Sequence, residues 1–393
     1  MFKLRIESPK ICIAKCTGKT SKGSLVDPGQ GKLIQALIWI AAIIGIFALL
    51  GLLYQIAGTR RDARLYPPPG KMVDLGTHKL HVLAKGSSQG LSGPTILLEA
   101  GLMSTVLSWT DLQEELSKSY RVVSYDRAGL GWSDLGPMPR TAERIVEELH
   151  MMLQRANIAP PYVLVGHSFG GLTMPLFAAR YPEEIVGMVL VDPVAPAEWN
   201  PPSEQDRKMT RIGATVCRRA AFLSQFGLIR FVGFLLTTKA KDVAGRLVRL
   251  ISRGTPSQSG TVSSPWFWAL PANERAMAAV FWIQKKFALT IASQLENLPV
   301  SAASLEQAGF TTDKPVVIFS ANTAPKRRRE EHKAMAERLS LGEHVTAHNS
   351  NHWIMQEEPT LLLDAIRNVA ASRDSAASPT AEGLPKRGVV GKV

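Results

Sequence analysis

Ser168 has the clearest chemical context of any residue in this sequence. It lies in VLVGHSFGGL, with Gly166 and Gly170 two positions away on either side. A serine hydroxyl is a poor nucleophile at neutral pH, so it attacks a carbonyl carbon only where a neighbouring base takes its proton. The pattern Gly-x-Ser-x-Gly between a strand and a helix is typical of a nucleophile elbow, a sharp turn that presents the serine Oγ above a sheet. We therefore predict that Ser168 is a nucleophile, with an ordinary strand-to-helix turn as the alternative.

His352 is the best candidate for the base. It lies in AHNSNHWIMQEEP, after the last expected strand and before an amphipathic segment, LLLDAIRNVA. The chain order Ser then His is the order found in triads built around such an elbow. His344 and His348 lie within the expected strand itself, and the alternative for His352 is a surface loop histidine.

The elements that would position these two residues alternate along the chain. Helical patterns such as TAERIVEELHMMLQRA separate short apolar strand candidates, which lie at residues 78–85, 95–100, 121–126, 162–167, 187–192, 315–320 and 343–348. This alternation is typical of an α/β fold, in which helices cover both faces of a mostly parallel, doubly wound sheet. Ser168 would then follow a buried strand, and the small residues Gly170 and Gly171 would let the next helix pack close to that strand.

Several segments of the sequence, taken together, resemble the motifs of a known family. The segments LLEAGL, YDRAGLGWSD, VLVGHSFGG, VLVDP and NSNHWI, in this order, resemble those of the α/β-hydrolase superfamily, in particular its esterase-like and lipase-like members. The resemblance covers roughly residues 70–370. It implies the α/β-hydrolase fold, with about eight mostly parallel strands, a Ser-acid-His triad and a helical cap inserted after the sixth strand.

The resemblance also implies an oxyanion hole built from two backbone N–H groups. One belongs to Phe169, directly after the nucleophile, where the start of a helix adds the positive end of its dipole. The other belongs to the loop EAGLMST, where relatives often have His-Gly and this chain has Ala100-Gly101, which leaves Leu102 as the expected donor. We expect Glu99 beside this loop to form a salt bridge or a cap.

The acid of the triad has competing candidates. Many relatives carry Asp after the seventh strand, but PVVIFSANTAPKRRREEH has no carboxylate before Glu330. Asp192 ends the strand that follows the nucleophile helix, where some relatives place their acid, and the chain order Ser, Asp, His is kept. We predict Asp192 as the acid, with Glu330 or Glu331 as alternatives and a strand-ending turn as the other explanation of Asp192. Asp126 in YDRAGLGWSD is expected to be structural.

Residues from about 195 to 310 interrupt the strand pattern and are expected to form the cap. They include AAFLSQFGLIRFVGFLL and the aromatic residues Trp266, Phe267 and Trp268, which we expect to line an acyl pocket above the elbow. Between residues 195 and 255 the chain has eleven Lys or Arg and four Asp or Glu. Such a basic, aromatic cap fits the surface of an anionic lipid membrane, and a solvated helix face is the alternative.

Charge and cysteine content limit the partners further. The net charge of +13 on 393 residues favours anionic surfaces. The run KRRR at residues 326–329 has no recognised nucleic-acid module beside it, so we expect a solvated helix start and no nucleic-acid partner. Cys12, Cys16 and Cys217 have no metal-site spacing, and we expect neither a metal nor a cofactor.

Residues 33–57, LIQALIWIAAIIGIFALLGLLYQIA, carry no charge. As a helix they would extend roughly 37 Å, which is enough to cross a hydrocarbon core. A signal peptide would have a shorter apolar core nearer the start, and a buried core helix would be shorter and have a polar face. We therefore predict a single transmembrane helix. Basic residues lie close to both ends of the run, so the positive-inside rule leaves both orientations open near the helix. Lys3, Arg5, Lys10 and Lys15 tilt the balance toward an N-terminus on the cytoplasmic side, with the catalytic domain on the other side.

The expected order of parts follows from these features. A basic N-terminal segment (1–32) precedes the membrane helix (33–57), and a Pro-rich spacer (58–70) leads to the hydrolase domain (71–370) and a disordered tail (371–393). We expect a membrane-anchored serine hydrolase acting on carboxylic esters, lipid esters included. A serine peptidase or amidase of the same fold and a noncatalytic binding protein are the alternatives. Relatives with an aspartate nucleophile, which open epoxides, are disfavoured because the elbow holds serine.

Overall fold

A central sheet organises the protein. The computed structural model describes residues 28–86, 93–236, 270 and 272–376. Eight strands of this described part form one sheet in the order β1-β2-β4-β3-β5-β6-β7-β8. Their bounds are β1 (Lys71–Asp74), β2 (Lys79–Lys85), β3 (Thr95–Glu99), β4 (Val122–Tyr125), β5 (Tyr162–His167), β6 (Ile185–Val191), β7 (Val316–Ala321) and β8 (Gly342–Ala347). Strand β2 pairs antiparallel with β1 and β4, and the other neighbouring pairs are parallel.

The seven strands predicted from apolar runs are confirmed as β2 to β8. Strand β1 was not predicted because its sequence, KMVD, contains no apolar run. In the structure only Val73 of its four residues is buried. It is held instead by its antiparallel pairing with β2. The sheet is therefore the mostly parallel one that the sequence indicates, with an antiparallel edge.

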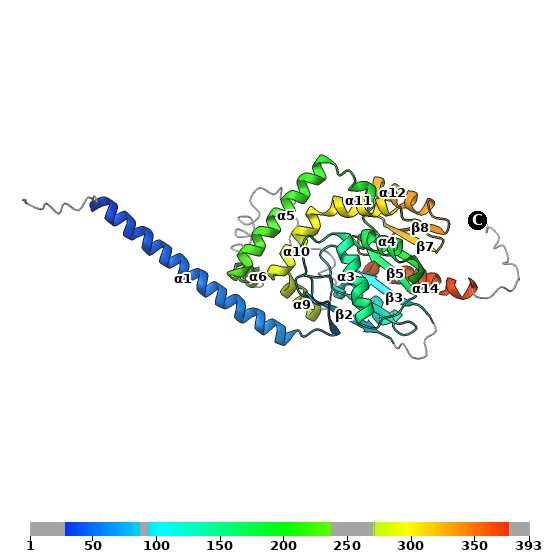
Figure 1. The fold of residues 1–393 in the computed structure, drawn as a ribbon, viewed down its shortest axis with the longest axis horizontal. Helices are drawn as coiled ribbons and strands as arrows, with labels where there is room; N and C mark the ends of the chain where they lie inside the picture. Colours follow the sequence, from blue (N-terminus) through cyan, green and yellow to red (C-terminus); the bar gives the residue numbers. More distant parts are fainter. Residues whose placement is uncertain (1–27, 87–92, 237–269, 271, 377–393) are drawn as a thin grey trace, which may run out of the picture. The chain divides into compact units, whose positions relative to one another are not determined.

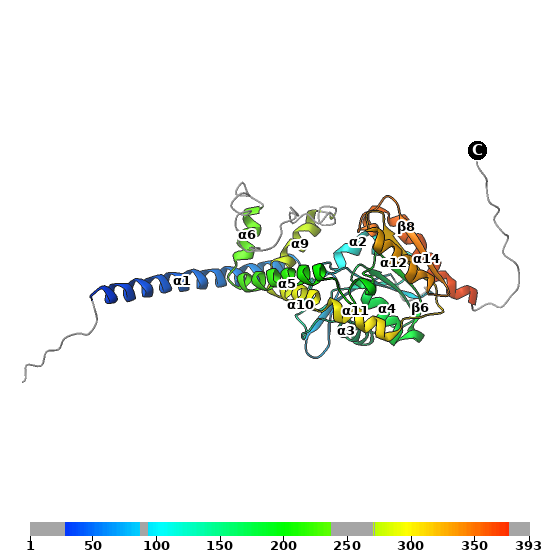
Figure 2. The same ribbon diagram turned by 90° about the horizontal axis from the view of Figure 1, so that it is seen from above.

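Helices cover both faces of the sheet (Figures 1 and 2). Two large apolar cores lie on opposite sides, because successive residues of each strand point to opposite faces. On one face lie α3 (Ala142–Arg155), α4 (Gly170–Arg180), α11 (Leu298–Ala308) and α12 (Lys326–Glu337). On the other lie α2 (Thr110–Leu116) and α14 (Pro359–Ala376), with the short η1 (Val106–Trp109) and α13 (Ile354–Glu357) nearby. The chain segments that enter the candidate site follow β3, β5, β6 and β8, and all of them emerge at the carboxyl ends of parallel strands.

The predicted cap is present between β6 and β7 (Figure 1). After the short η2 (Pro182–Glu184) and β6, the chain forms η3 (Pro196–Glu198) and then the cap helices α5 (Glu204–Gln225), α6 (Leu228–Leu236), α9 (Ala272–Trp282) and α10 (Lys285–Glu296). Helix α5 packs along α10, and Ser203 caps its start by accepting a hydrogen bond from the Asp206 N–H. Trp266, Phe267 and Trp268 lie outside the described residues.

Helix α1 (Pro28–Leu65) contains the charge-free run of residues 33–57. It is long and apolar enough to cross a membrane, and none of its most apolar window is buried in the protein, so it is a candidate membrane anchor. The helix continues to Leu65, which corrects the spacer expected from residue 58. Residues 58–65 include the good helix formers Arg, Ala and Leu, and the first proline after them is Pro67.

The other end of the chain differs from the prediction in the same way. We expected a disordered tail from residue 371, but α14 continues to Ala376. Its last six residues, ASRDSA, contain no proline or glycine that would stop the helix. Residues 377–393 lie outside the described part of the chain.

Candidate active site

Ser168 lies in a sharp turn between β5 and α4. Its φ angle is 52°, in the left-handed region that only a few non-glycine residues adopt. Three backbone hydrogen bonds fix the turn. The Ser168 N–H donates to the Val191 carbonyl at 3.0 Å, and the Ser168 carbonyl accepts from the N–H groups of Gly171 at 2.9 Å and Val194 at 2.8 Å. A Cβ atom at Gly166 would lie 2.6 Å from the Gly170 carbonyl oxygen, so the close turn requires glycine there. The Ser168 side chain is partly exposed, as a nucleophile must be.

His352 and Asp192 meet although 160 residues separate them. His352 Nδ1 lies 2.5 Å from Asp192 Oδ2, in the loop between β8 and α13. The other carboxylate oxygen of Asp192 accepts a hydrogen bond from the Ala321 N–H at 3.1 Å. Burial by itself would raise the pKa of Asp192, but the hydrogen bonds from His352 and Ala321 lower this pKa below its usual value. The carboxylate is therefore held charged, with one oxygen facing the imidazole.

The alternative acids lie elsewhere. Glu330 is on α12, where its carboxylate lies 3.7 Å from Lys326 Nζ and its side chain is 63% exposed. Glu331 follows on the same helix and lines a cavity of about 380 Å³ between α4, α11 and α12. Among the three predicted carboxylates, the structure brings Asp192 to His352.

His167, directly before Ser168, supports the loop that carries His352. Its Nε2 donates a hydrogen bond to the His352 carbonyl at 2.9 Å, and its ring lies 4.6 Å from the His352 ring and 4.8 Å from the Trp353 ring. Burial lowers the pKa of His167 to about 3, so the ring is neutral at physiological pH. Sequence reasoning did not single out His167, because position x of Gly-x-Ser-x-Gly has no required residue type.

His167 also makes the stability of the folded protein depend on pH. An unfolded histidine binds a proton below about pH 6.5, whereas the pKa of folded His167 is about 3. Between these values the unfolded state binds more protons, so the free energy of unfolding falls as the pH is lowered, by up to about 1.4 kcal/mol per pH unit. From about pH 6.5 to 5, we expect the wild type to lose roughly 2 kcal/mol more stability than His167→Gln. Urea unfolding of the full chain in detergent measures this difference. Glutamine retains an N–H donor without titrating, and an equal loss in both proteins would contradict the assignment.

The predicted oxyanion loop passes directly beside the nucleophile. A Cβ atom at Gly101 would lie 3.3 Å from Ser168 Cβ, so the loop after β3 approaches the serine closely only because residue 101 is glycine. Phe169, the other predicted donor, immediately follows Ser168 and precedes α4. The structure therefore places the loop that contains Leu102 next to the elbow that contains Phe169.

Arg127 holds this loop and was not predicted. Its guanidinium donates hydrogen bonds to the carbonyls of three consecutive residues, at 2.6 Å to Ala100 and 3.2 Å to Leu102, with Gly101 between them. It also forms a buried ion pair with Glu99 and lies over the Phe169 ring at 5.1 Å. Glu99 is thus part of a salt bridge, as expected. Arg127 lies in the YDRAGLGWSD motif, but nothing in its spacing indicates contact with residues 99–102.

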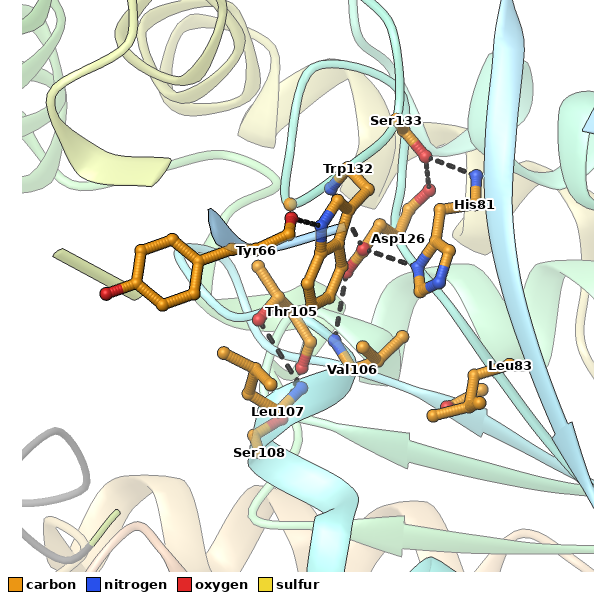
Figure 3. Close-up of polar contacts among 12 residues, drawn as sticks. Tyr66, His81, Leu83, Thr105, Val106, Leu107, Ser108, Asp126, Trp132 and Ser133 are labelled. Carbon is orange, nitrogen blue, oxygen red and sulfur yellow. Dashed lines mark hydrogen bonds and ion pairs between the residues drawn. The ribbon is translucent and has the colours of Figure 1, made fainter. Parts of the chain in front are cut away.

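Asp126 is structural, as the sequence indicates (Figure 3). Its carboxylate accepts hydrogen bonds from His81 Nδ1 at 2.8 Å, the Val106 N–H at 2.9 Å and the Trp132 N–H at 3.2 Å. Its carbonyl accepts one from the Ser133 hydroxyl at 2.6 Å. Asp126 is 1% exposed, and these donors join β2, β4, η1 and the turn after β4. The carboxylate is therefore committed to the fold.

An apolar aromatic cluster lies beside His352. It consists of Leu107, Leu270, Ala278 and Phe281, with Trp132, Met277, Trp282 and Trp353 packed against them. The Trp132 and Phe281 rings are 4.8 Å apart and edge to face. Because Trp353 follows His352 in the chain, the cluster adjoins the candidate triad. Among the described residues, no group of three His, Cys, Asp or Glu could hold a metal ion.

Comparison with known proteins identifies the family. A family model for the alpha/beta hydrolase fold matches residues 94–359. A thermophilic esterase from Thermogutta terrifontis has a TM-score of 0.51 at 20% identity, with 76% of this chain and 98% of that chain covered. A putative epoxide hydrolase from Pseudomonas aeruginosa has a TM-score of 0.55 at 16% identity, with 78% and 97% covered. At these identities the similarity concerns the fold.

Curated sequences match over shorter stretches. The uncharacterized protein YqjL of Bacillus subtilis is 39% identical over 105 residues, which cover 27% of this chain and 42% of YqjL. The chain covers 18% and 57% of two further curated relatives, so it spans less than two thirds of each of the three. The family model, in contrast, covers more than half of the chain and includes Ser168, Asp192 and His352. The chain belongs to the alpha/beta hydrolase fold family.

Proposed function

We propose that the protein is a membrane-anchored serine hydrolase that cleaves carboxylic esters, lipid esters included, by a Ser168-His352-Asp192 triad. The observation that supports this most is the 2.5 Å hydrogen bond between His352 and Asp192, in a loop packed on the residue before Ser168. When Nδ1 carries the proton shared with Asp192, His352 Nε2 is left unprotonated and can act as a base.

The reaction has two halves. Ser168 Oγ attacks the ester carbonyl carbon while His352 Nε2 takes its proton, and the backbone N–H groups of Phe169 and Leu102 stabilise the oxyanion. Collapse of the tetrahedral intermediate expels the alcohol, which receives the proton from His352, and leaves the acyl group on Ser168. Water then gives a proton to His352 and attacks the acyl carbon. Collapse of this second intermediate breaks the bond to Ser168 Oγ, which takes the proton back from His352, and the carboxylic acid leaves.

The choice between esters and epoxides depends on the nucleophile. Proteins of this fold include the esterase and the putative epoxide hydrolase described above. Epoxide opening in such relatives uses an aspartate at the elbow, and this chain has Ser168. A serine forms an acyl-enzyme from a carbonyl substrate, so we propose ester cleavage. The pairing of Asp192 with His352 likewise favours an enzyme over a noncatalytic binding protein.

The acyl chain would bind against the aromatic cluster beside His352. Leu107 and Phe281 are buried inside this cluster, and the partly buried Trp132 and Trp353 pack against it, so that Trp353 joins the cluster to the candidate base. In this proposal the described cluster adds to the acyl pocket expected from Trp266, Phe267 and Trp268, which lie outside the described residues. A pocket formed there would favour longer acyl chains over acetyl, because each methylene that it buries contributes about 0.8 kcal/mol to binding.

Hydrolysis of p-nitrophenyl esters from acetyl to palmitoyl by the full chain in detergent tests this function. We expect kcat/KM to rise roughly tenfold for every two methylenes that the pocket buries, up to the length that it holds. We also expect a fluorophosphonate probe to label the protein, because such probes react with activated serines. The absence of both hydrolysis across the series and labelling would contradict the proposal and favour a binding protein.

A further inference from the structure

The end of α5 and helix α6 carry an unusual set of exposed aromatic side chains. We define the phenylalanine patch as Phe222, Phe226, Phe231 and Phe234, whose side chains are between 36% and 60% exposed. The rings of Phe222 and Phe226 pack edge to face at 5.3 Å, and Phe231 and Phe234 are three residues apart on α6, so each pair lies on one face of its helix end. Large apolar side chains gathered on a surface mark a site of contact with a partner or a membrane.

The patch is continuous with the end of the candidate membrane helix. A Cβ atom at Gly51 would lie 2.2 Å from the Phe226 carbonyl oxygen, and one at Gly227 would lie 2.7 Å from the Tyr54 ring. Gly227 also has a φ angle of 68°. The two backbones approach this closely only because both positions are glycine. The turn between α5 and α6 is therefore packed directly against residues of the charge-free run.

The residues of α1 that contact the α5–α6 turn and α6 lie on one face of the helix. Gly51, Gln55, Gly58 and Asp62 recur at helical spacing and are each partly buried, whereas Leu52, Leu53, Ile56 and Ala57 are exposed. A Cβ atom at Gly58 would lie 2.5 Å from the Arg230 side chain. Helix α6 therefore packs along α1 from inside the charge-free run to beyond its end at Ala57.

This arrangement sets the depth of the patch. Gly51 lies six residues before Ala57, so it is about 9 Å inside the end of the charge-free run at 1.5 Å per residue. Phe226 contacts Gly51 and must lie at a similar level. If the run crosses a bilayer, as in the proposed function on which this step rests, the patch lies at the depth of the acyl chains nearest the headgroups.

Arg230 is the charged residue of α6, and its contacts suit this location. Its Nη1 forms a 2.7 Å ion pair with Asp62 Oδ2, and its Nε donates a hydrogen bond to Gln55 Oε1 at 3.2 Å. Both charged side chains are 11% exposed. Asp62 lies five residues beyond the charge-free run, so Arg230 extends toward the polar end of α1, as arginines do at a membrane boundary. The pair neutralises the one charge that would oppose insertion of α6.

We propose that the phenylalanine patch inserts into the lipid bilayer beside the last turns of the membrane helix, so that the cap is an interfacial element as well as a cover for the active site. Helix α6 also contacts the segment after α9, because a Cβ atom at Gly233 would lie 3.8 Å from Ile283. Helix α9 contributes Phe281 and Trp282 to the aromatic cluster beside His352. Helix α6 therefore connects the patch to the cap helix that contributes to the aromatic cluster.

Depth measurement in vesicles tests the insertion without relying on catalysis. The full chain, with Cys12→Ser, Cys16→Ser and Cys217→Ser, carries Phe231→Cys labelled with an environment-sensitive fluorophore and is reconstituted in phosphatidylcholine–phosphatidylglycerol vesicles. Leu341→Cys is the matched control, because Leu341 is similarly exposed but lies between α12 and β8. We expect lipids with shallow nitroxide labels to quench the fluorophore at position 231 at least about threefold more than the control. Equal, weak quenching at both positions overturns the proposal, as does protection of position 231 in a dimer of the chain.

A second measurement separates insertion from the chemistry. Phe222→Ser with Phe231→Ser is expected to lower hydrolysis of a long-chain ester dissolved in vesicles by roughly tenfold, while hydrolysis of soluble p-nitrophenyl acetate stays unchanged. The control is Val300→Ser with Leu341→Ser, which removes equally exposed apolar side chains elsewhere. If the two double variants lose the same amount of activity on the vesicle-dissolved ester, the proposed insertion of the phenylalanine patch is contradicted. If every variant lacks esterase activity, the proposed function fails, while the quenching result still decides the insertion.

Discussion

Replacing Ser168 by alanine is expected to lower kcat for ester hydrolysis by roughly 10⁴-fold or more and to abolish labelling by a fluorophosphonate. The alanine has no oxygen to form the acyl-enzyme, so only binding and the oxyanion donors remain to assist attack by water. Within the described part of the chain, the hydrogen bonds that fix the turn are made by the Ser168 backbone and not by its hydroxyl. The variant should therefore fold normally. Initial rates with the preferred p-nitrophenyl ester and a thermal unfolding curve measure both effects.

The control for this variant is Ser117→Ala. The Ser117 hydroxyl donates to the Glu114 carbonyl on the exposed end of α2, and its loss should leave the rate unchanged. If Ser168→Ala keeps most of the activity while its unfolding curve matches the wild type, the covalent mechanism is wrong.

Replacing Asp192 by asparagine is expected to lower kcat by about 10³- to 10⁴-fold with a smaller change in KM. The carboxylate oxygen that faces His352 accepts a hydrogen bond from Nδ1 and stabilises the imidazolium that forms during the reaction. An asparagine amide placed there favours the tautomer with the proton on Nε2, which cannot accept the proton of Ser168. The Ala321 N–H can still bond to the amide oxygen, so the backbone support of position 192 is retained. Steady-state kinetics over the ester series measures the change in kcat and the change in KM separately.

Glu330→Gln is the matched control for the acid. Its side chain is exposed and paired with Lys326, so its loss should change kcat by less than about twofold. A large loss with Glu330→Gln and a small one with Asp192→Asn would move the acid to α12. The double variant Ser168→Ala with Asp192→Asn should be about as slow as Ser168→Ala alone, because residues of one triad act as a unit.

Local patterns determined much of this protein. The apolar runs that became β2 to β8, the glycines around Ser168 and the charge-free run in α1 each act over a few neighbouring residues, where strand pairing, a tight turn or helix length follows directly from residue type. The same holds for His352, whose position after the last strand is readable from chain order. The fold class and the elbow were therefore predictable from the sequence.

Contacts between distant segments decided the rest. The pairing of Asp192, rather than Glu330, with His352 depends on how the end of β6 and the loop after β8 meet. Arg127 reaches residues 100–102 only because β3 and β4 are neighbours. Strand β1 is defined by its partner rather than by its own four residues. The phenylalanine patch follows the same logic: the sequence indicated a basic, aromatic cap that fits a membrane surface, but the packing of Gly51 against Phe226 and of Gly227 against Tyr54 depends on the tertiary structure. Residue types specify local conformation, but pairings across long stretches of chain arise only when the whole sheet and its helices pack together.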